Sequence, residues 1–353
     1  MRTETKVQAV IAIILILVMG GAILLLVRFR DQKAPEDNGT GISLFMNEGE
    51  SYSVLSFLKE KEEGKPHDLL IRLPAEMDHS AITYENDPEG KVFSISIPGL
   101  REDYFRDFFI EGDKERLLDI SFEFNESRSL IKLLFNDFTC VEPSREENFL
   151  CLDYKAPSDY YEKIVVLDAG EGGMETGAVV FGCVEKDINL SIMMKLREAF
   201  SEETASRRIG IYCTRKNDAY VKSEDRVAFA KALDADLFLS IHMSSTSSGR
   251  QSDFSGTRVL YRVTDETGLS KAFSTLCLSS LVEALSSKDR GVVAGDEDYL
   301  VRESDMPVAL CEIGYMTNMD ELSKLMDNEY QEKAAWALHD AVVEMLSGEM
   351  HDE

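Results

Sequence analysis

The stretch that decides the fold is Ile-Val-Val-Leu-Asp-Ala-Gly-Glu-Gly-Gly, residues 164–173. An apolar run ends there in acidic residues and a glycine-rich turn, a pattern typical of a buried strand and the loop after it. Three later segments also place an ionisable residue after an apolar run: 184–189 with Glu185, 237–242 with His242, and 308–314 with Glu312. Groups at the carboxyl ends of strands in open α/β sheets converge on one crevice. Three carboxylates and one imidazole there predict a metal site with an acid/base, the chemistry of hydrolysis.

The rhythm around these segments predicts an α/β domain over residues 158–353. Strand-like and helix-like runs alternate, which is typical of a three-layer fold with a mostly parallel sheet. We expect strands near 163–168, 209–214, 236–241, 257–262 and 307–312, and helices near 187–200, 223–234, 267–286 and 328–347. His339 falls on the last helix, where we expect it on the polar face and not as a metal ligand.

Residues 43–157 show a different pattern, with short runs that alternate apolar and polar positions. The runs at 92–97 and 118–124 are examples, and they predict a small antiparallel β domain. His67 and His79 stand alone in this region, so we expect surface residues and no cluster of ligands. Cys140 and Cys151 flank an expected hairpin, and the sequence leaves open whether they pair. The six cysteines contain no Cys-x-x-Cys pair, which excludes a zinc ribbon.

The N-terminal segment predicts a membrane anchor. Residues 7–27 are apolar except for Gln8, and at ~1.5 Å per residue they can span a hydrocarbon core of roughly 30 Å. The run ends without the small-residue pattern of a cleavage site, so we expect a single uncleaved span within residues 1–30. A polar linker with proline and glycine follows at 31–42. Basic residues flank the span on both sides, so the charge pattern does not decide its orientation.

The charge of the chain restricts its partners. A formal net charge of −27 repels nucleic acid, so the bulk of the protein is not expected to bind it. The same acidic surface repels anionic polymers, so a substrate of that kind must be held by local groups.

The region from Lys163 to Leu346 resembles the zinc-dependent N-acetylmuramoyl-L-alanine amidases of the Amidase_3 type. The matching stretches follow the family order: 166–173 in the place of Asp-Pro-Gly-His-Gly-Gly, 185–190 (Glu-Lys-Asp-Ile-Asn-Leu), 214–215, 226–228, 236–242 and 306–318. The resemblance implies that Glu185 and His242 bind the metal and that Glu312 is the general acid/base. Glu171 occupies the place of the family's first histidine ligand, so it completes the predicted metal set.

The resemblance also implies the reaction and its setting. The expected substrate is peptidoglycan, cut at the amide between N-acetylmuramic acid and L-alanine, by an enzyme on the bacterial cell membrane whose bulk faces the wall. Exchanging an imidazole for the Glu171 carboxylate makes the donor set harder, which weakens the preference for Zn²⁺ over Mn²⁺. Reduced activity is expected, and two alternatives stay open: a retired amidase fold that binds the wall or regulates a partner, and a metal-dependent hydrolase that faces the cytoplasm.

Overall fold

The computed structural model describes residues 52–53, 58–60, 66–100, 104, 110–124 and 127–348. All of the described helices and strands belong to one compact unit, Met46–Glu353. Within this part of the chain, no helix is both long enough and apolar enough to cross a bilayer. The anchor predicted at 7–27 and the linker predicted at 31–42 lie outside the described residues.

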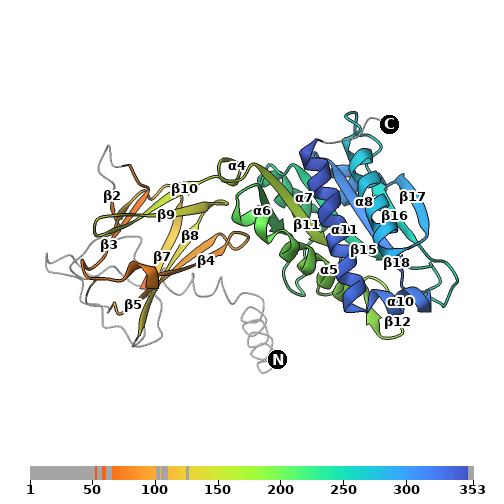
Figure 1. Cartoon of the computed structure of the whole chain (residues 1–353), viewed down its shortest axis with the longest axis horizontal. Helices are drawn as coiled ribbons and strands as arrows, with labels where there is room; N and C mark the ends of the chain where they lie inside the picture. The colour runs from red at the N-terminus through yellow and green to blue at the C-terminus, as the bar shows by residue number, and fades with distance from the viewer. Residues whose placement is uncertain are drawn as a thin grey trace, which may run out of the picture. The chain divides into compact units, whose positions relative to one another are not determined.

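Two five-stranded β-sheets form the first region (Figure 1). The orders are β1-β7-β8-β5-β4 and β2-β6-β3-β10-β9. β8 alternates strictly between buried and partly exposed residues, as a strand with one face in a core should. All pairs run antiparallel except β2 with β6, which run parallel. The strands are β1 (Tyr52–Ser53), β2 (Lys59–Glu60), β3 (Leu69–Arg72), β4 (Thr83–Asp87), β5 (Val92–Pro98), β6 (Glu111–Gly112), β7 (Leu117–Phe124), β8 (Arg128–Phe135), β9 (Cys140–Glu146) and β10 (Phe149–Lys155).

A six-stranded sheet organises the second region, in the order β14-β11-β15-β18-β16-β17. Four of its neighbouring pairs are parallel, and only β16 and β18 run antiparallel. β11 is buried at every position except Lys163, which is typical of a central strand covered on both faces. The strands are β11 (Lys163–Ala169), β14 (Ile209–Cys213), β15 (Leu237–Ser244), β16 (Thr257–Tyr261), β17 (Asp289–Ala294) and β18 (Val308–Tyr315), beside a two-stranded hairpin of β12 (Val179–Val180) and β13 (Cys183–Val184).

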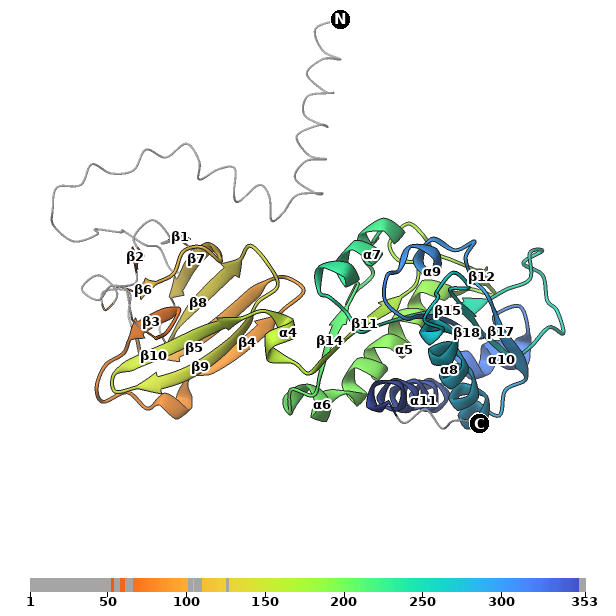
Figure 2. The same ribbon diagram turned by 90° about the horizontal axis from the view of Figure 1, so that it is seen from above.

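Helices cover both faces of this sheet, so the fold has three layers, as predicted. Figure 2 shows α5, α8 and α11 on one side of the strands and α7 and α9 on the other. A hydrophobic core lies on each face of the sheet, and alternate residues of β11 point into the two cores. Val165 and Leu167 pack in one core, and Ile164 and Val166 pack in the other. The helices are α4 (Pro157–Tyr160), α5 (Glu185–Ala199), α6 (Ser201–Ala205), α7 (Ser223–Ala232), α8 (Leu269–Leu285), α9 (Tyr299–Glu303), α10 (Met319–Leu325) and α11 (Asn328–Ser347).

Several local predictions were wrong. β17 was missed, as were the short helices α6, α9 and α10. β15 and β18 continue past their expected ends, so His242 lies inside a strand and not just after it, and Glu312 lies inside a strand and not at its end. His339 is 9% exposed and packs against Phe200, with ring centroids 4.5 Å apart, instead of facing solvent.

In the first region the structure answers the cysteine question that the sequence left open, and it corrects the histidine prediction. Cys140 and Cys151 are free thiols, because the β9–β10 register places Cys140 opposite Lys155 and Cys151 opposite Ser144. His67 does not stand alone, because Glu146, Asp153 and Cys151 lie around it.

Candidate metal centre

The turn after β11 carries the first predicted ligand. Glu171 has a φ of 62°, and the following glycines have φ values of 136° and 57°. A left-handed backbone at a residue other than glycine costs on the order of 1 kcal/mol, so neighbouring contacts must hold Glu171 in place. The amide N–H of Gly172 donates to the carbonyl of Glu175 at 2.8 Å and closes this turn.

Two buried arginines anchor the same turn from the side. Arg226 donates to Asp168 Oδ1 at 2.6 Å and to the backbone carbonyl of Glu171 at 2.6 Å. Arg215 donates to the carbonyls of Ala169 at 2.8 Å and of Gly170 at 2.9 Å. These bonds fix the backbone that presents the Glu171 side chain.

Asp168 is committed to this anchor and is not a ligand. It is fully buried, pairs with Arg226, and accepts hydrogen bonds from the hydroxyls of Thr214 and Ser240 at 2.6 Å each. Burial alone would raise the pKa of its carboxyl, but the Arg226 charge and these hydrogen bonds outweigh burial, and the pKa is lowered. Asp168 therefore stays ionised within the fold.

Glu185 is the first residue of α5, where the helix dipole favours a carboxylate. Its Oε2 accepts the amide N–H of Ala178 at 2.9 Å, and its Oε1 accepts that of Met243 at 3.1 Å. Burial raises the pKa of Glu185, but hydrogen bonds and the charge of His242 prevail and lower it. The side chain is thus oriented and ionised by groups from two other segments.

His242 faces this carboxylate from β15. Its Nδ1 lies 3.4 Å from Glu185 Oε1, while its Nε2 is buried and makes no hydrogen bond. A Cβ at Gly170 would lie 2.1 Å from the imidazole Cε1, so only glycine leaves room for the ring. Burial lowers the pKa of His242, but the nearby carboxylates outweigh that effect and raise it.

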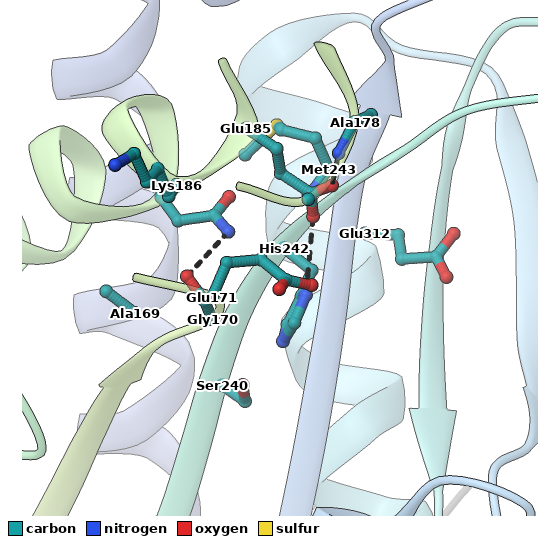
Figure 3. Close-up of polar contacts among 12 residues, drawn as sticks. Ala169, Gly170, Glu171, Ala178, Glu185, Lys186, Ser240, His242, Met243 and Glu312 are labelled. Atoms are coloured by element: carbon teal, nitrogen blue, oxygen red, sulfur yellow. Dashed lines mark hydrogen bonds and ion pairs between the residues drawn. The ribbon is translucent and has the colours of Figure 1, made fainter. Parts of the chain in front are cut away.

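The three predicted ligands meet in one cluster. One donor atom from each of Glu171, Glu185 and His242 lies within 4.8 Å of the others, and Figure 3 shows both carboxylates beside the imidazole. Burial, followed by the charges of Glu185 and Glu175, raises the pKa of Glu171, although His242 and Arg226 oppose that shift. A divalent cation fits this set, because it would relieve carboxylate repulsion and use the orphaned imidazole nitrogen.

Glu312 lies beside the cluster but is not part of it. β18 places Glu312 opposite His242 on β15, yet Figure 3 shows its carboxylate pointing away from His242. Arg258 on β16 holds that carboxylate with two bonds, Nε to Oε2 at 2.6 Å and Nη2 to Oε1 at 2.8 Å. Glu312 must leave this position to reach a group held at the cluster.

Arg215 and Arg226 lie in the family-like segments 214–215 and 226–228, but the sequence predicted no role for either, and it did not point to Arg258. Arg215 and Arg226 donate hydrogen bonds to backbone carbonyls, and a pattern of side chains in the sequence does not reveal such contacts. A single arginine in an apolar strand, directly before Val259, was the available signal for Arg258.

The fold and the cluster together define a three-layer α/β protein with a candidate divalent-metal centre at the carboxyl ends of β11 and β15. Residues 165–344 match the N-acetylmuramoyl-L-alanine amidase family (Amidase_3), and the chain belongs to this family.

Two relatives come from Bacillus subtilis (strain 168). The chain is 39% identical over 176 residues to the uncharacterized protein YqiI, covering 50% of this chain and 81% of YqiI. It is 33% identical over 179 residues to the N-acetylmuramoyl-L-alanine amidase LytC, covering 51% of this chain and 34% of LytC. The crystal structure of an N-acetylmuramoyl-L-alanine amidase from Clostridium difficile 630 is 28% identical, with a TM-score of 0.49, over 53% of this chain and 98% of the other.

Proposed function

We propose that this protein hydrolyses the amide between N-acetylmuramic acid and L-alanine in peptidoglycan. The observation that carries the proposal is the convergence of Glu171, Glu185 and His242 within 4.8 Å, in a chain of the amidase family. The relative LytC bears the name of this activity. The apolar run at 7–27 supports a single-pass anchor in the bilayer. The proposed peptidoglycan substrate, and not this run, is the reason to place the bulk of the protein on the cell-wall side.

Each site residue has a distinct part in the proposed reaction. Glu171, Glu185 and His242 would hold Zn²⁺ or Mn²⁺. When bound, such an ion polarises the scissile carbonyl and makes a water a stronger nucleophile at neutral pH. Glu312 would accept the proton of the attacking water and deliver it to the leaving amine. Arg215 and Arg226 hold the turn that presents Glu171.

A second candidate function is a non-catalytic wall-binding or regulatory module. The contact that favours it is the two-bond pair between Arg258 and Glu312, which occupies the proposed base. Turnover separates the two functions. Purified protein is incubated with purified peptidoglycan and either Zn²⁺ or Mn²⁺, and newly exposed L-alanine amino groups are counted. New amino groups support the amidase, while their absence with both metals favours the module.

The first prediction concerns the exchanged ligand. Glu171→His should tighten Zn²⁺ binding by about tenfold and raise the preference for Zn²⁺ over Mn²⁺, because imidazole is a softer donor than carboxylate. Competition with a chromogenic chelator measures both affinities.

The matched control is Glu266→His, an exposed glutamate of the loop before α8, which should leave both affinities unchanged. Equal zinc affinity in the wild type and in Glu171→His would show that Glu171 does not touch the ion.

A further inference from the structure

Three ionisable side chains lie in one row across neighbouring strands at the proposed site. His242 on β15 is opposite Glu312 on β18, and Glu312 is opposite Arg258 on β16. Adjacent strands are ~4.8 Å apart, so the backbone of Arg258 lies two strand spacings, roughly 10 Å, from the backbone of His242. The row thus runs from a proposed metal ligand through the proposed base to a cation.

Arg258 is available to a ligand that approaches this edge. Its side chain is 38% exposed, whereas the side chain of Glu312 is 14% exposed. The other cations near the site are already engaged. Arg226 is buried and paired with Asp168, and Lys186 is bound to Asp218 at 2.6 Å. Because the chain carries a net charge of −27, an anionic substrate needs a local cation of this kind.

The contact that Arg258 makes now is one that a substrate carboxylate can replace. A guanidinium binds any carboxylate through the same planar pair of N–H donors. Glu312 accepts both of its hydrogen bonds from Arg258, among the described residues. Exchange of Glu312 for another carboxylate would leave Arg258 paired and free Glu312 to turn toward His242.

We propose that Arg258 binds a carboxylate of the stem peptide and releases Glu312 in exchange. This inference rests on the proposed amidase function and adds a substrate preference to it. An extended peptide advances ~3.3 Å per residue, so about three residues cover the roughly 10 Å of backbone that the row spans. The substrate we propose is accordingly a muramoyl tripeptide with a free terminal carboxylate.

Two synthetic substrates test this preference, a muramoyl tripeptide with a free terminal carboxylate and its terminal amide. The wild type should cleave the acid with a kcat/KM about tenfold above that of the amide, the size expected of hydrogen bonds to a charged group. Arg258→Gln should bring the ratio near one, and Arg258→Lys should fall between, because it keeps the charge without the planar pair. Arg302→Gln, a comparably exposed arginine paired with Glu303, should keep the wild-type ratio.

Calorimetric binding of the same two peptides separates this inference from the proposed function. Tighter binding of the acid that is lost in Arg258→Gln supports the carboxylate site even when no variant cleaves. An acid-to-amide ratio that Arg258→Gln leaves unchanged overturns the role of Arg258, whether or not the protein is an amidase. A purely structural role predicts equal losses on both substrates and also overturns it.

A separate cluster in the first region carries a second inference. His67 precedes β3, and its Nδ1 lies 3.0 Å and 3.1 Å from the two carboxylate oxygens of Asp153. Its Nε2 is buried and makes no hydrogen bond, although Glu146 Oε1 is 3.2 Å away. Donor atoms of His67, Glu146 and Cys151 all lie within 4.8 Å of one another, and the Cys151 thiol is fully buried.

This arrangement is the one that metal-binding histidines adopt. A ligating imidazole usually donates its other N–H to a carboxylate, which fixes the tautomer and directs the free nitrogen at the ion. Asp153 is placed to do this for His67, and Nε2 then faces Glu146, in the same group of donors as the Cys151 thiol. Nitrogen, sulfur and oxygen donors together suit Zn²⁺.

We infer that His67, Glu146 and Cys151 form a second Zn²⁺ site, with Asp153 orienting the imidazole. The alternative is a protonated His67 held between two carboxylates, without an ion. The two differ in the state of Cys151, because metal binding requires its thiolate and releases a proton.

Cobalt(II) reports that state directly, because a cobalt–thiolate bond gives an intense near-ultraviolet charge-transfer band. The full chain titrated with Co²⁺ should develop the band, and Cys151→Ser and His67→Ala should abolish it. Cys140→Ser, a buried cysteine of the neighbouring strand β9, should keep it, as should His242→Ala. No band in the wild type, or a band that survives in Cys151→Ser, would overturn the site.

Discussion

Glu312→Gln is expected to lower kcat for muramoyl amide hydrolysis by about 10²–10⁴-fold, the usual contribution of a positioned acid/base. The amide of glutamine can neither accept the proton of the attacking water nor return it to the leaving amine. The three proposed ligands stay in place, so metal affinity should change little, while KM for the free-acid substrate should fall because the Glu312 carboxylate no longer competes for Arg258. Steady-state kinetics on a soluble muramoyl tripeptide, with metal content measured in parallel, give all three quantities.

The matched control for this variant is Arg258→Gln. Both substitutions break the pair between Arg258 and Glu312, but only Glu312→Gln removes the proposed base. On the free-acid substrate, Arg258→Gln should therefore cost about tenfold, far less than Glu312→Gln. Equal losses would mean that Glu312 matters only as the partner of Arg258.

The layered fold could be predicted because local sequence encodes it. The run at 164–167 is apolar enough to be buried on both faces, and apolar residues recur with a helical period over 328–347. β17 was missed because its residues 289–294 begin with two charges and a glycine, and its burial is only partial. Its pairing with β16, not its own composition, makes it a strand.

The candidate site could be predicted only in part, for a similar reason. Glu171, Glu185 and His242 each lie in a family-like motif, so the sequence could predict that they form one site. The contact of Arg258 with Glu312 depends on the antiparallel register of β16 and β18, and this register cannot be read from the sequence of either strand alone. His67 and Asp153 are separated by 86 positions, so no local pattern links them.

His339 shows how tertiary packing overrides a helical pattern. The spacing of α11 placed it on the polar face, but Phe200, which follows α5, covers it. The neighbouring Trp336 covers another side, with ring centroids 5.1 Å apart. The periodicity of a helix does not show which of its polar residues another segment will bury.

The other large effect is expected for Arg226→Gln, which should lower the free energy of unfolding by about 3–5 kcal/mol. Asp168 is fully buried and Arg226 is nearly so, and removing the guanidinium leaves the carboxylate without its counter-charge. The variant also loses the bond to the carbonyl of Glu171, so binding of Zn²⁺ should weaken too. Urea unfolding followed by circular dichroism measures the first effect, and chelator competition measures the second.

Lys231→Gln is the control, because Lys231 lies on the same helix α7 and pairs with Asp305 at the surface. Exposed pairs of this kind contribute about 0–1 kcal/mol, so its stability should hardly change. An equally small change in Arg226→Gln would contradict a buried, unscreened ion pair.

The pH dependence of this difference provides an independent check on the Asp168 pair. The pKa of Asp168 is lowered in the fold, against about 3.9 for an unfolded aspartate. Its contribution to stability is therefore complete above pH ~3.9 and is lost as the pH falls from there toward the folded pKa. Without Arg226 that ionisation is no longer favoured, so the gap between wild type and Arg226→Gln should be widest near neutral pH and narrow in acid. A gap that stays constant from neutral pH down to pH ~3 would assign the loss to packing and backbone contacts instead of charge.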